Sequence, residues 1–386
     1  EEASCDLLSI EKMQVAGYDI EEANKIFSTF LTFILITAVI LSVVFVVFAD
    51  PIIRFCGSEE MTHDSAVLYY KIIMGGMIFN VIQMGINSAQ RGSGNTKITM
   101  RTNMVSNTVN IIFNYLLIGG HFGFPALGIK GAALATVLGT VVSSIMSIIS
   151  VCKGDTFVNL PFIWKNKILP GWEALKSIIK VGYSVFAEQI LMRIGFMMTA
   201  LMAADQGTAA MAAHQVGMNV MSLSFSFGDG MQVAAVTLIG QSLGQKNIEL
   251  AKKYGTICQR IGNLISVVLS LLYLLLGEWF YGLYFEEQET INIGIRIMRV
   301  MVLIVLMQVS QVIYMGCLRG AGDVKFTTVA STISVTFIRP IASYLFAYVC
   351  NLGVIGIWMG VVCDQICRLV LTNWRFKSGK WTEIKI

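Results

Sequence analysis

Glu188 places a carboxylate inside a long apolar stretch of this sequence, residues 174–203. Ionisable groups within a membrane are costly, so they pair with one another or serve a function. A carboxylate at this position is suited to binding a proton, a sodium ion or a cationic solute. The competing interpretation is structural, a pairing with Arg193 or a helix-end residue.

Amide side chains recur every three or four residues in two other apolar stretches, a spacing that puts them on one helix face. They are Asn80, Gln83 and Asn87, then Asn103, Asn107, Asn110 and Asn114. Amide oxygens are hard ligands suited to sodium, and amides also hydrogen-bond between membrane helices. Both roles, ion or solute contact and interhelical bonding, are open. Gln308 and Gln311 stand 228 positions after Asn80 and Gln83 and predict a second polar face.

Arg339 and Asp364 lie midway along two further apolar stretches. They are candidates for contact with a solute, and a structural Arg–Asp pair explains them equally well. Arg368, one helical turn after Asp364, offers the same structural explanation.

The composition requires that these residues belong to a membrane protein. Of 386 residues, 55% are hydrophobic and 13% are charged, against roughly a quarter charged in soluble domains. Eight cysteines are scattered singly, so we expect no disulfide framework and no resident metal.

A helix that crosses lipid needs about 20 mainly apolar residues. We predict ten spans, at about 26–48, 66–88, 100–120, 127–151, 174–203, 208–240, 257–277, 292–317, 326–350 and 352–374. Gly228-Asp229-Gly230 is expected to interrupt the sixth.

Loop charges alternate along the chain. Loops such as those with Lys97, Lys153 and Lys246 are basic, whereas the loop 278–291 is acidic. Basic loops stay in the cytoplasm, so we expect both termini on the cytoplasmic side of a multi-pass protein.

The chain also repeats itself. Arg91-Gly92-Ser93-Gly94-Asn95-Thr96-Lys97 resembles Arg319-Gly320-Ala321-Gly322-Asp323-Val324-Lys325, 228 positions later. We interpret Arg91, Gly92 and Gly94, with Arg319, Gly320, Gly322 and Asp323, as structural turn motifs. The first does not fit a phosphate-binding Walker motif, which needs Gly-x4-Gly-Lys-Ser/Thr.

Both turns face the cytoplasm, so the repeats have the same orientation, and a substrate path is expected between or within the two bundles. Projecting the second repeat back by 228 positions predicts that the first lacks about two helices, leaving four plus six spans of a six-plus-six architecture. The expected domains are a non-native or disordered tail (1–16), an N-terminal lobe (17–155), a linker (156–173) and a C-terminal lobe (174–386).

In combination these motifs resemble the multidrug and toxic compound extrusion (MATE) family, and most closely its bacterial DNA-damage-inducible protein F branch. Besides the two Arg-Gly turns, the matching runs are Pro125–Thr136, Ala212-Ala213-His214-Gln215, Gly240–Gly244 and Ser378-Gly379-Lys380-Trp381. The resemblance covers residues 17–386 and implies two six-helix lobes in a V. Glu188 matches an acidic position of the family's C-terminal lobe, and Gln308 stands where some sodium-coupled members have Asp. Positions matching Asn110 and Asn114 often hold Asn and Asp.

The resemblance implies a monomeric antiporter in the bacterial plasma (inner) membrane. It would export small organic cations or drugs by alternating access in exchange for Na⁺ or H⁺, with no cofactor and no nucleic-acid partner. A flippase for lipid-linked precursors is the alternative, but it predicts a strongly cationic cavity, and few intramembrane Arg or Lys are present. A membrane-embedded enzyme would need a polar cluster at one depth, whereas His63, His121 and His214 lie near the outer ends of spans. We favour a packing role for His214.

Overall fold

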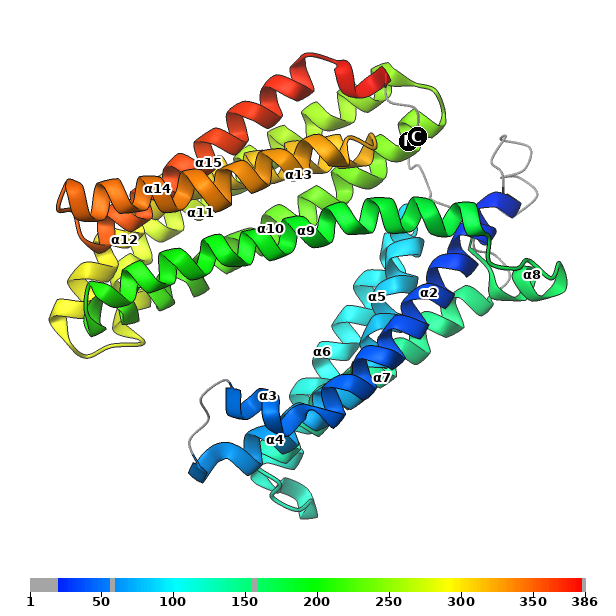
Figure 1. The fold of residues 1–386 in the computed structure, drawn as a ribbon, viewed down its shortest axis with the longest axis horizontal. Coiled ribbons are helices and arrows are strands. Elements are labelled where there is room, and N and C mark those ends of the chain that lie inside the picture. The colour runs from blue at the N-terminus through cyan, green and yellow to red at the C-terminus, as the bar shows by residue number, and fades with distance from the viewer. Residues whose placement is uncertain (1–19, 56–59, 154–157, 384–386) are drawn as a thin grey trace. The chain divides into compact units, whose positions relative to one another are not determined.

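The computed structural model describes residues 20–55, 60–153 and 158–383. These residues are almost entirely helical and include no strand, which confirms the all-α fold class (Figure 1). The chain forms two compact units that divide between Ile179 and Lys180, inside one long helix. The tail expected at 1–16 lies outside the described residues.

The first unit presents an apolar surface typical of helices in lipid. Its helices are α2 Ile20–Val47, α3 Ala49–Phe55, α4 Glu60–Gly75, α5 Met77–Gly92, α6 Thr96–Gly119, η1 His121–Gly123, α7 Ile129–Cys152 and α8 Leu160–Lys165. On α2, the side chains of Ile36, Ile40 and Val43 are more than half exposed. Their spacing of four and three residues puts them on one face of the helix, so α2 exposes a hydrophobic stripe suited to contact with lipid.

The second unit is built around one central helix. Its elements are α9 Trp172–Asp205, α10 Thr208–Gly244, α11 Ile248–Gly282, α12 Gln288–Gly320, α13 Val324–Thr332, η2 Ile333–Ile338, α14 Arg339–Tyr344, η3 Leu345–Val349, α15 Val354–Lys377 and η4 Lys380–Glu383. Helix α12 packs against α10, α11 and α15. Ile297, Met301 and Ile304 on α12 are completely buried, so this helix supplies the middle of the core.

Eight helical segments within the described ranges are long and apolar enough to cross a membrane. They are Ile20–Val47, Thr62–Gly92, Ile129–Cys152, Trp172–Asp205, Ile248–Gly282, Gln288–Gly320, Val324–Val349 and Val354–Lys377. Helices α6 and α10, with 24 and 37 residues, also have the necessary length. Helix α6 is less apolar because it carries the four asparagines. Helices therefore occupy all ten stretches that the sequence predicts as spans.

The predicted interruption at Gly228-Asp229-Gly230 is wrong, because α10 continues without a break from Thr208 to Gly244. Gly228 is buried, and a Cβ atom added there would lie 3.5 Å from Val312 of α12. A small residue at this position lets the two helices approach closely. The glycine therefore serves packing between helices and not a chain break.

The stretch predicted as the ninth span is a helix with two wider turns. The π-helical segments η2 and η3 lie on either side of α14, which begins with Arg339-Pro340. Proline lacks the N–H that would continue the α-helical hydrogen bonds, and π turns often occur at functional sites. This segment carries Arg339 with its side chain fully buried.

The two Arg-Gly turns have the same backbone geometry. After α5, the amide of Gly94 donates to the carbonyl oxygen of Arg91 at 2.9 Å, and after α12, Gly322 donates to Arg319 at 3.0 Å. Gly94 and Gly322 have φ angles of 89° and 81°, a region that favours glycine because it lacks a Cβ atom. The internal repeat is therefore a repeat of structure as well as of sequence.

Candidate functional site: a polar cavity and two buried ion-pair clusters

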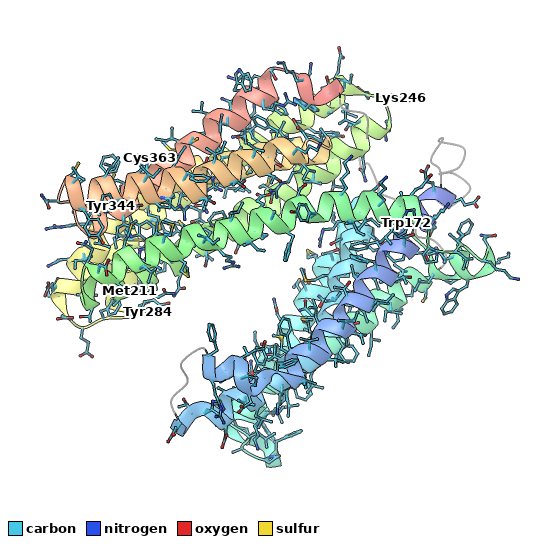
Figure 2. The ribbon with its side chains drawn as sticks, viewed as in Figure 1. Trp172, Met211, Lys246, Tyr284, Tyr344 and Cys363 are labelled. Carbon is cyan, nitrogen blue, oxygen red and sulfur yellow. The ribbon has the colours of Figure 1, made fainter. Side chains whose placement is uncertain are left out.

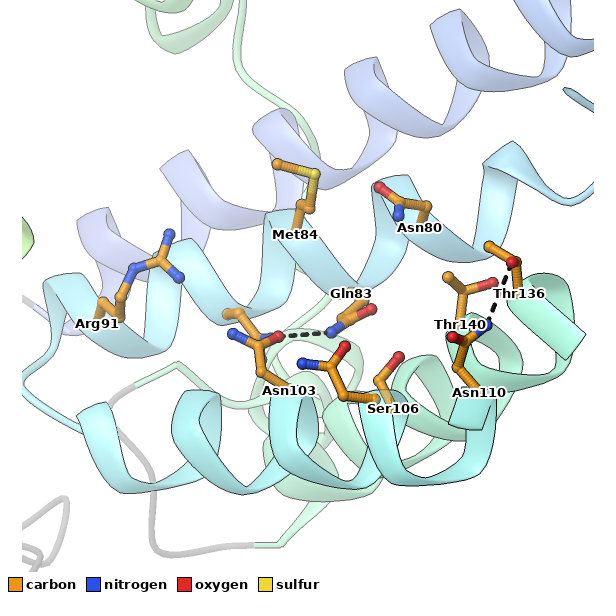
Figure 3. A pocket seen from close by; sticks show the side chains of 11 residues that line it. Asn80, Gln83, Met84, Arg91, Asn103, Ser106, Asn110, Thr136 and Thr140 are labelled. Carbon is orange, nitrogen blue, oxygen red and sulfur yellow. Dashed lines mark hydrogen bonds between the residues drawn. The ribbon is translucent and has the colours of Figure 1, made fainter. Parts of the chain in front are cut away.

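The first unit contains a cavity of about 520 Å³ between α5, α6 and α7 (Figure 3). Its lining residues are Asn80, Gln83, Met84, Asn87, Arg91, Asn103, Ser106, Asn107, Asn110, Thr136 and Thr140. Most of them are neutral side chains that can donate or accept hydrogen bonds. A cavity of this size is in the range of small-molecule sites.

Two of the lining amides are committed to bonds between helices. The amide nitrogen of Gln83 donates to Oδ1 of Asn103 at 2.9 Å, and its Oε1 accepts from the hydroxyl of Ser143 at 2.7 Å. Asn87 likewise donates to Oγ1 of Thr102 at 3.0 Å and accepts from Ser147 at 3.1 Å. Both amides are buried. They fix α6 and α7 against α5 and so hold the cavity walls in place.

The remaining predicted amides differ in their freedom to contact a solute. Asn80 and Asn107 are exposed and line the cavity. Asn110 lines it too, and its amide donates to Oγ1 of Thr136 at 3.2 Å. Asn114 donates to Oδ1 of Asn110 at 3.1 Å and is not among the lining residues. Three of these four residues thus form a polar wall, and Asn114 supports it.

Sequence reasoning missed some of the lining residues. Arg91 was interpreted only as a turn residue, yet Figure 3 shows it at one end of the cavity, opposite Asn110 and Thr136. Thr136 and Thr140 are four residues apart on α7 and therefore share a face. Their periodicity with Ser143 and Ser147 could have identified the α7 wall.

In the second unit, Glu188 of α9 binds the Arg-Gly turn that follows α12. Nη2 of Arg319 donates to both carboxylate oxygens of Glu188, at 2.8 and 3.0 Å, and Thr328 donates to Oε2 at 3.1 Å. The carboxylate is buried, whereas the Arg319 side chain is a quarter exposed. The sequence allows Arg193 or a helix-end residue as the structural partner, and the observed partner is Arg319, in the last turn of α12. The turn is tied down further by Nε of Arg375, which donates to Asp323 at 2.7 Å.

The second cluster joins α14 to α15. Oδ2 of Asp364 accepts from Nη2 of Arg339 at 2.6 Å and from Nη2 of Arg368 at 2.8 Å. All three side chains are at least 97% buried, and the Arg339 guanidinium lies 4.5 Å from the centre of the Phe196 ring. Two cations share one anion, so the cluster carries a net positive charge. This arrangement is the structural Arg–Asp pairing that the sequence left open.

Gln308 and Gln311 lie on α12 and are completely buried. Their amide atoms have no hydrogen-bond partner within the described part of the chain. The matched positions in the first unit, Asn80 and Gln83, line the cavity. The two repeats therefore place related polar positions in different surroundings.

His214 packs against Trp358, with ring centres 5.5 Å apart.

Comparison with known proteins gives consistent matches over most of the chain. The MatE family model matches residues 16–116 and 185–345. The "Probable multidrug resistance protein NorM" of Thermotoga maritima is 29% identical over 93% of this chain and 76% of its own length. The "Uncharacterized transporter YisQ" of Bacillus subtilis is 25% identical over 87% of this chain and 73% of its own. An outward-facing multidrug resistance MATE family transporter has a TM-score of 0.86 at 20% identity, over 95% of this chain and 81% of that one.

Proposed function

Because this chain belongs to the MatE family, whose members are transporters and not enzymes, we propose that it exports organic cations and drugs in exchange for Na⁺ or H⁺. The relatives named as multidrug resistance proteins support this choice of cargo. The membrane would be the bacterial plasma membrane. A membrane potential supplies ~2.3 kcal/mol per charge per 100 mV, so exchange of one ion can drive accumulation of a cargo without hydrolysis of a nucleotide.

The observation that supports the proposal best is the cavity of about 520 Å³ in the first unit. Apart from Met84 and Arg91, its lining residues are neutral amides and hydroxyls. Exposed amides such as Asn80 and Asn107 can exchange hydrogen bonds with water for hydrogen bonds with a cargo. We propose that these two residues and Asn110 contact the cargo, while Gln83 and Asn87 hold the walls.

We further propose that the basic loops and both termini face the cytoplasm, because basic loops are retained there. In a cysteine-free background, cysteine replaces Asp155 in one variant and Gln288 in another. A membrane-impermeant maleimide added to intact cells is expected to label only the variant at Gln288. Labelling at Asp155 alone would reverse the orientation.

Proteoliposomes containing the purified chain test the transport function. We expect ethidium to be moved against its gradient when a Na⁺ or a H⁺ gradient is imposed, and the two gradients are applied separately to identify the coupling ion. Asn107→Leu combined with Asn110→Leu should reduce transport at least tenfold, because it removes two polar groups from the cavity and adds apolar bulk. The control is Asn166→Leu, which removes an exposed amide directly after α8 that does not line the cavity. Equal transport by empty liposomes, or by protein with no gradient, would reject the proposal.

A further inference from the structure

We propose that the second unit binds a small monovalent anion, of the size of chloride, in the interior of its helix bundle. The site lies where Arg339 of α14 and Arg368 of α15 meet Asp364, beside the amides of Gln308 and Gln311 on α12. The anion balances charge inside the bundle. It is therefore separate from the cargo and from the coupling ion of the export function proposed above.

The cluster of Arg339, Asp364 and Arg368 has a surplus of positive charge. Both arginines donate to Oδ2 of Asp364, and all three side chains are at least 97% buried. Within the described residues, neither arginine pairs with a second carboxylate. Glu188 of α9 is already neutralised by Arg319. A net charge within a membrane-spanning bundle is costly, and a bound anion removes that cost.

Buried polar atoms without partners accompany the surplus charge. Nε of Arg368 and both amide atoms of Gln308, Gln311 and Gln365 have no hydrogen-bond partner in the described part of the chain, and these four side chains are almost completely buried. Buried polar groups are nearly always hydrogen-bonded, so such a set indicates a water or an ion among them. Oδ1 of Asp364 is unpartnered too and needs a donor. Water can satisfy donors and acceptors alike, but only an anion also balances the charge.

Helix spacing places the α12 amides beside the arginines. Gln308, Gln311 and Met315 are three and four residues apart, so they share one face of α12. The hydroxyl of Ser331 on α13 donates to Sδ of Met315 at 3.8 Å, so this face is directed at the helix that continues to Arg339. Because α13 runs back along α12 after the turn, Gln308, seven residues before Met315, and Arg339, eight residues after Ser331, both lie about two turns from this contact in the same direction.

The chemistry of the site favours chloride over larger anions. The surplus is a single positive charge, so a monovalent anion balances it and a divalent anion does not. The cluster is enclosed among packed helices, and the ring of Phe196 covers the Arg339 guanidinium at 4.5 Å, which leaves room for an ion and not for an organic acid. Ser334, about one π-helical turn before Arg339, adds a buried hydroxyl that has no partner among the described residues. Guanidinium, amide and hydroxyl groups are donors suited to an anion.

The dependence of stability on chloride tests the site in the purified full chain. Thermal unfolding is followed in detergent while sodium chloride replaces sodium gluconate at constant total sodium, so that only the anion changes. Chloride should raise the unfolding temperature along a saturating curve, by about 5 °C when the site is filled. Bromide should act like chloride, and sulfate should not. Equilibrium dialysis with radioactive chloride should give one bound ion per chain.

Three variants assign the bound ion to the cluster. Arg368→Gln leaves one positive and one negative group, so it should abolish both the chloride shift and the bound ion. Asp364→Asn leaves two arginines without a carboxylate, so it should show a larger chloride shift than the parent. Gln308→Leu removes a donor without changing the charge and should weaken chloride binding about tenfold. The control is Arg260→Gln, which removes an exposed arginine of α11 and should behave like the parent.

The other outcomes contradict the inference. If the unfolding temperature is equal in chloride and gluconate and no chloride is retained, the buried amides bind water alone. If exchange of sodium for a bulky organic cation at constant chloride causes the shift, the site binds a cation. If Arg368→Gln keeps the bound ion, chloride binds elsewhere, and if Asp364→Asn and Arg368→Gln change the shift in the same direction, charge balance is not its cause. These measurements do not use transport, so the export function is tested separately by the ethidium experiment.

Discussion

The two repeats use one helix-turn motif for different purposes. In the first unit the turn leaves Arg91 beside a cavity lined by amides and hydroxyls. In the second unit the same turn is locked, because Arg319 binds Glu188 and Asp323 binds Arg375. The helices of the first unit are joined by neutral bonds such as that from Ser143 to Gln83, whereas the second unit buries the charged side chains Arg339, Asp364 and Arg368 among its packed helices. The two turns therefore share a backbone geometry but not a binding site. A few side chains decide whether a polar cavity beside the turn stays open or is filled.

The largest expected effect tests whether the second unit depends on its buried charges. Asp364→Ala leaves Arg339 and Arg368 buried without a counter-charge, and removal of one partner of a buried ion pair costs about 3–5 kcal/mol. We expect thermal unfolding in detergent to shift strongly to lower temperature. The first-unit control is Ser88→Ala, which removes the hydroxyl that contacts Arg91 at an exposed position and should stay within about 0.5 kcal/mol of the parent.

A triple variant separates charge from packing. Asp364→Leu with Arg339→Met and Arg368→Met removes all three charges and keeps the side chains long, so it should recover much of the stability that Asp364→Ala loses. Parent-like unfolding of Asp364→Ala would show that the cluster contributes little, and the contrast between the units would fail.

The next effect concerns the locked turn. A double-mutant cycle with Glu188→Gln and Arg319→Gln should give a coupling energy of about 1.5–3 kcal/mol, the range for hydrogen bonds to charged groups. The control cycle pairs Glu188→Gln with Arg193→Gln and should give less than about 0.5 kcal/mol, because these two side chains form no ion pair in the described structure. A larger value for the Arg193 cycle would contradict the observed pairing.

The same Glu188→Gln variant tests the sequence-based hypothesis that this carboxylate binds the coupling ion. If it does, the variant should retain binding of ethidium and lose dependence of transport on the Na⁺ or H⁺ gradient. If the variant is less stable but its transport still depends on the gradient, the role of Glu188 is structural: it holds α9 against the turn after α12.

Matched glycines sharpen the comparison at a smaller scale. Gly320 and Gly92 end α12 and α5 at equivalent positions of the repeat. A Cβ atom at Gly320 would lie 2.6 Å from the carbonyl oxygen of Val236, whereas nothing lies within 4 Å of one at Gly92. Gly320→Ala should therefore cost about 1–3 kcal/mol by overpacking. Gly92→Ala should be neutral or stabilise by about 0.4–1 kcal/mol, and equal effects in thermal unfolding would reject this difference in packing.

The smallest effect concerns an exposed charge cluster of the first unit. Asp50 accepts from Nε2 of His63 at 2.8 Å and pairs with Nε of Arg54 at 3.1 Å. The hydrogen bond from His63, followed by the charge of Arg54, holds the pKa of Asp50 below its usual value. A lowered folded-state pKa adds stability above the unfolded pKa, and this stability is lost as the pH falls through the folded value. Asp50→Asn should therefore melt slightly below the parent at neutral pH, and the difference should disappear well below pH ~3.9. A difference that is constant with pH would contradict this assignment.

Much of the fold could be predicted because apolar length and repeat spacing are local properties of the sequence. The ten stretches and the equivalent turns at Arg91 and Arg319 follow from such patterns, and so does the one-turn spacing of Asp364 and Arg368. The interruption at Gly228 was predicted wrongly because a glycine in a helix has the same local signal whether it breaks the chain or receives a neighbouring helix. Only the position of Val312 on α12 decides between the two.

The candidate site was less predictable because its contacts are distant in sequence. The partner of Glu188 lies 131 positions away. Local spacing can suggest the nearby Arg193 or some helix-end residue, but it cannot single out Arg319. The sequence does predict that the amides of α5 and those of α6 each lie on one helix face, and six of these seven residues line the same cavity. Periodicity did not distinguish Gln83, which is spent on bonds to Asn103 and Ser143, from the exposed Asn80, because the distinction depends on which hydroxyls the neighbouring helices bring.

The π-helical segment η2 also affects which insertions and deletions this region can accept. A π turn contains one residue more than the α turn it replaces, so removal of a single residue from Ile333–Ile338 can restore an α-helix without breaking the chain of backbone hydrogen bonds. The residues after the deletion would keep nearly the same direction around the helix axis, because five steps of a π turn and four steps of an α turn cover about the same rotation. Arg339 would therefore still face Asp364. A deletion of one residue within the regular α-helix of Val324–Thr332 would instead rotate everything after it by about 100°. Relatives that are one residue shorter within Ile333–Ile338 should therefore keep this arginine against α15, whereas relatives shortened before Ile333 should not.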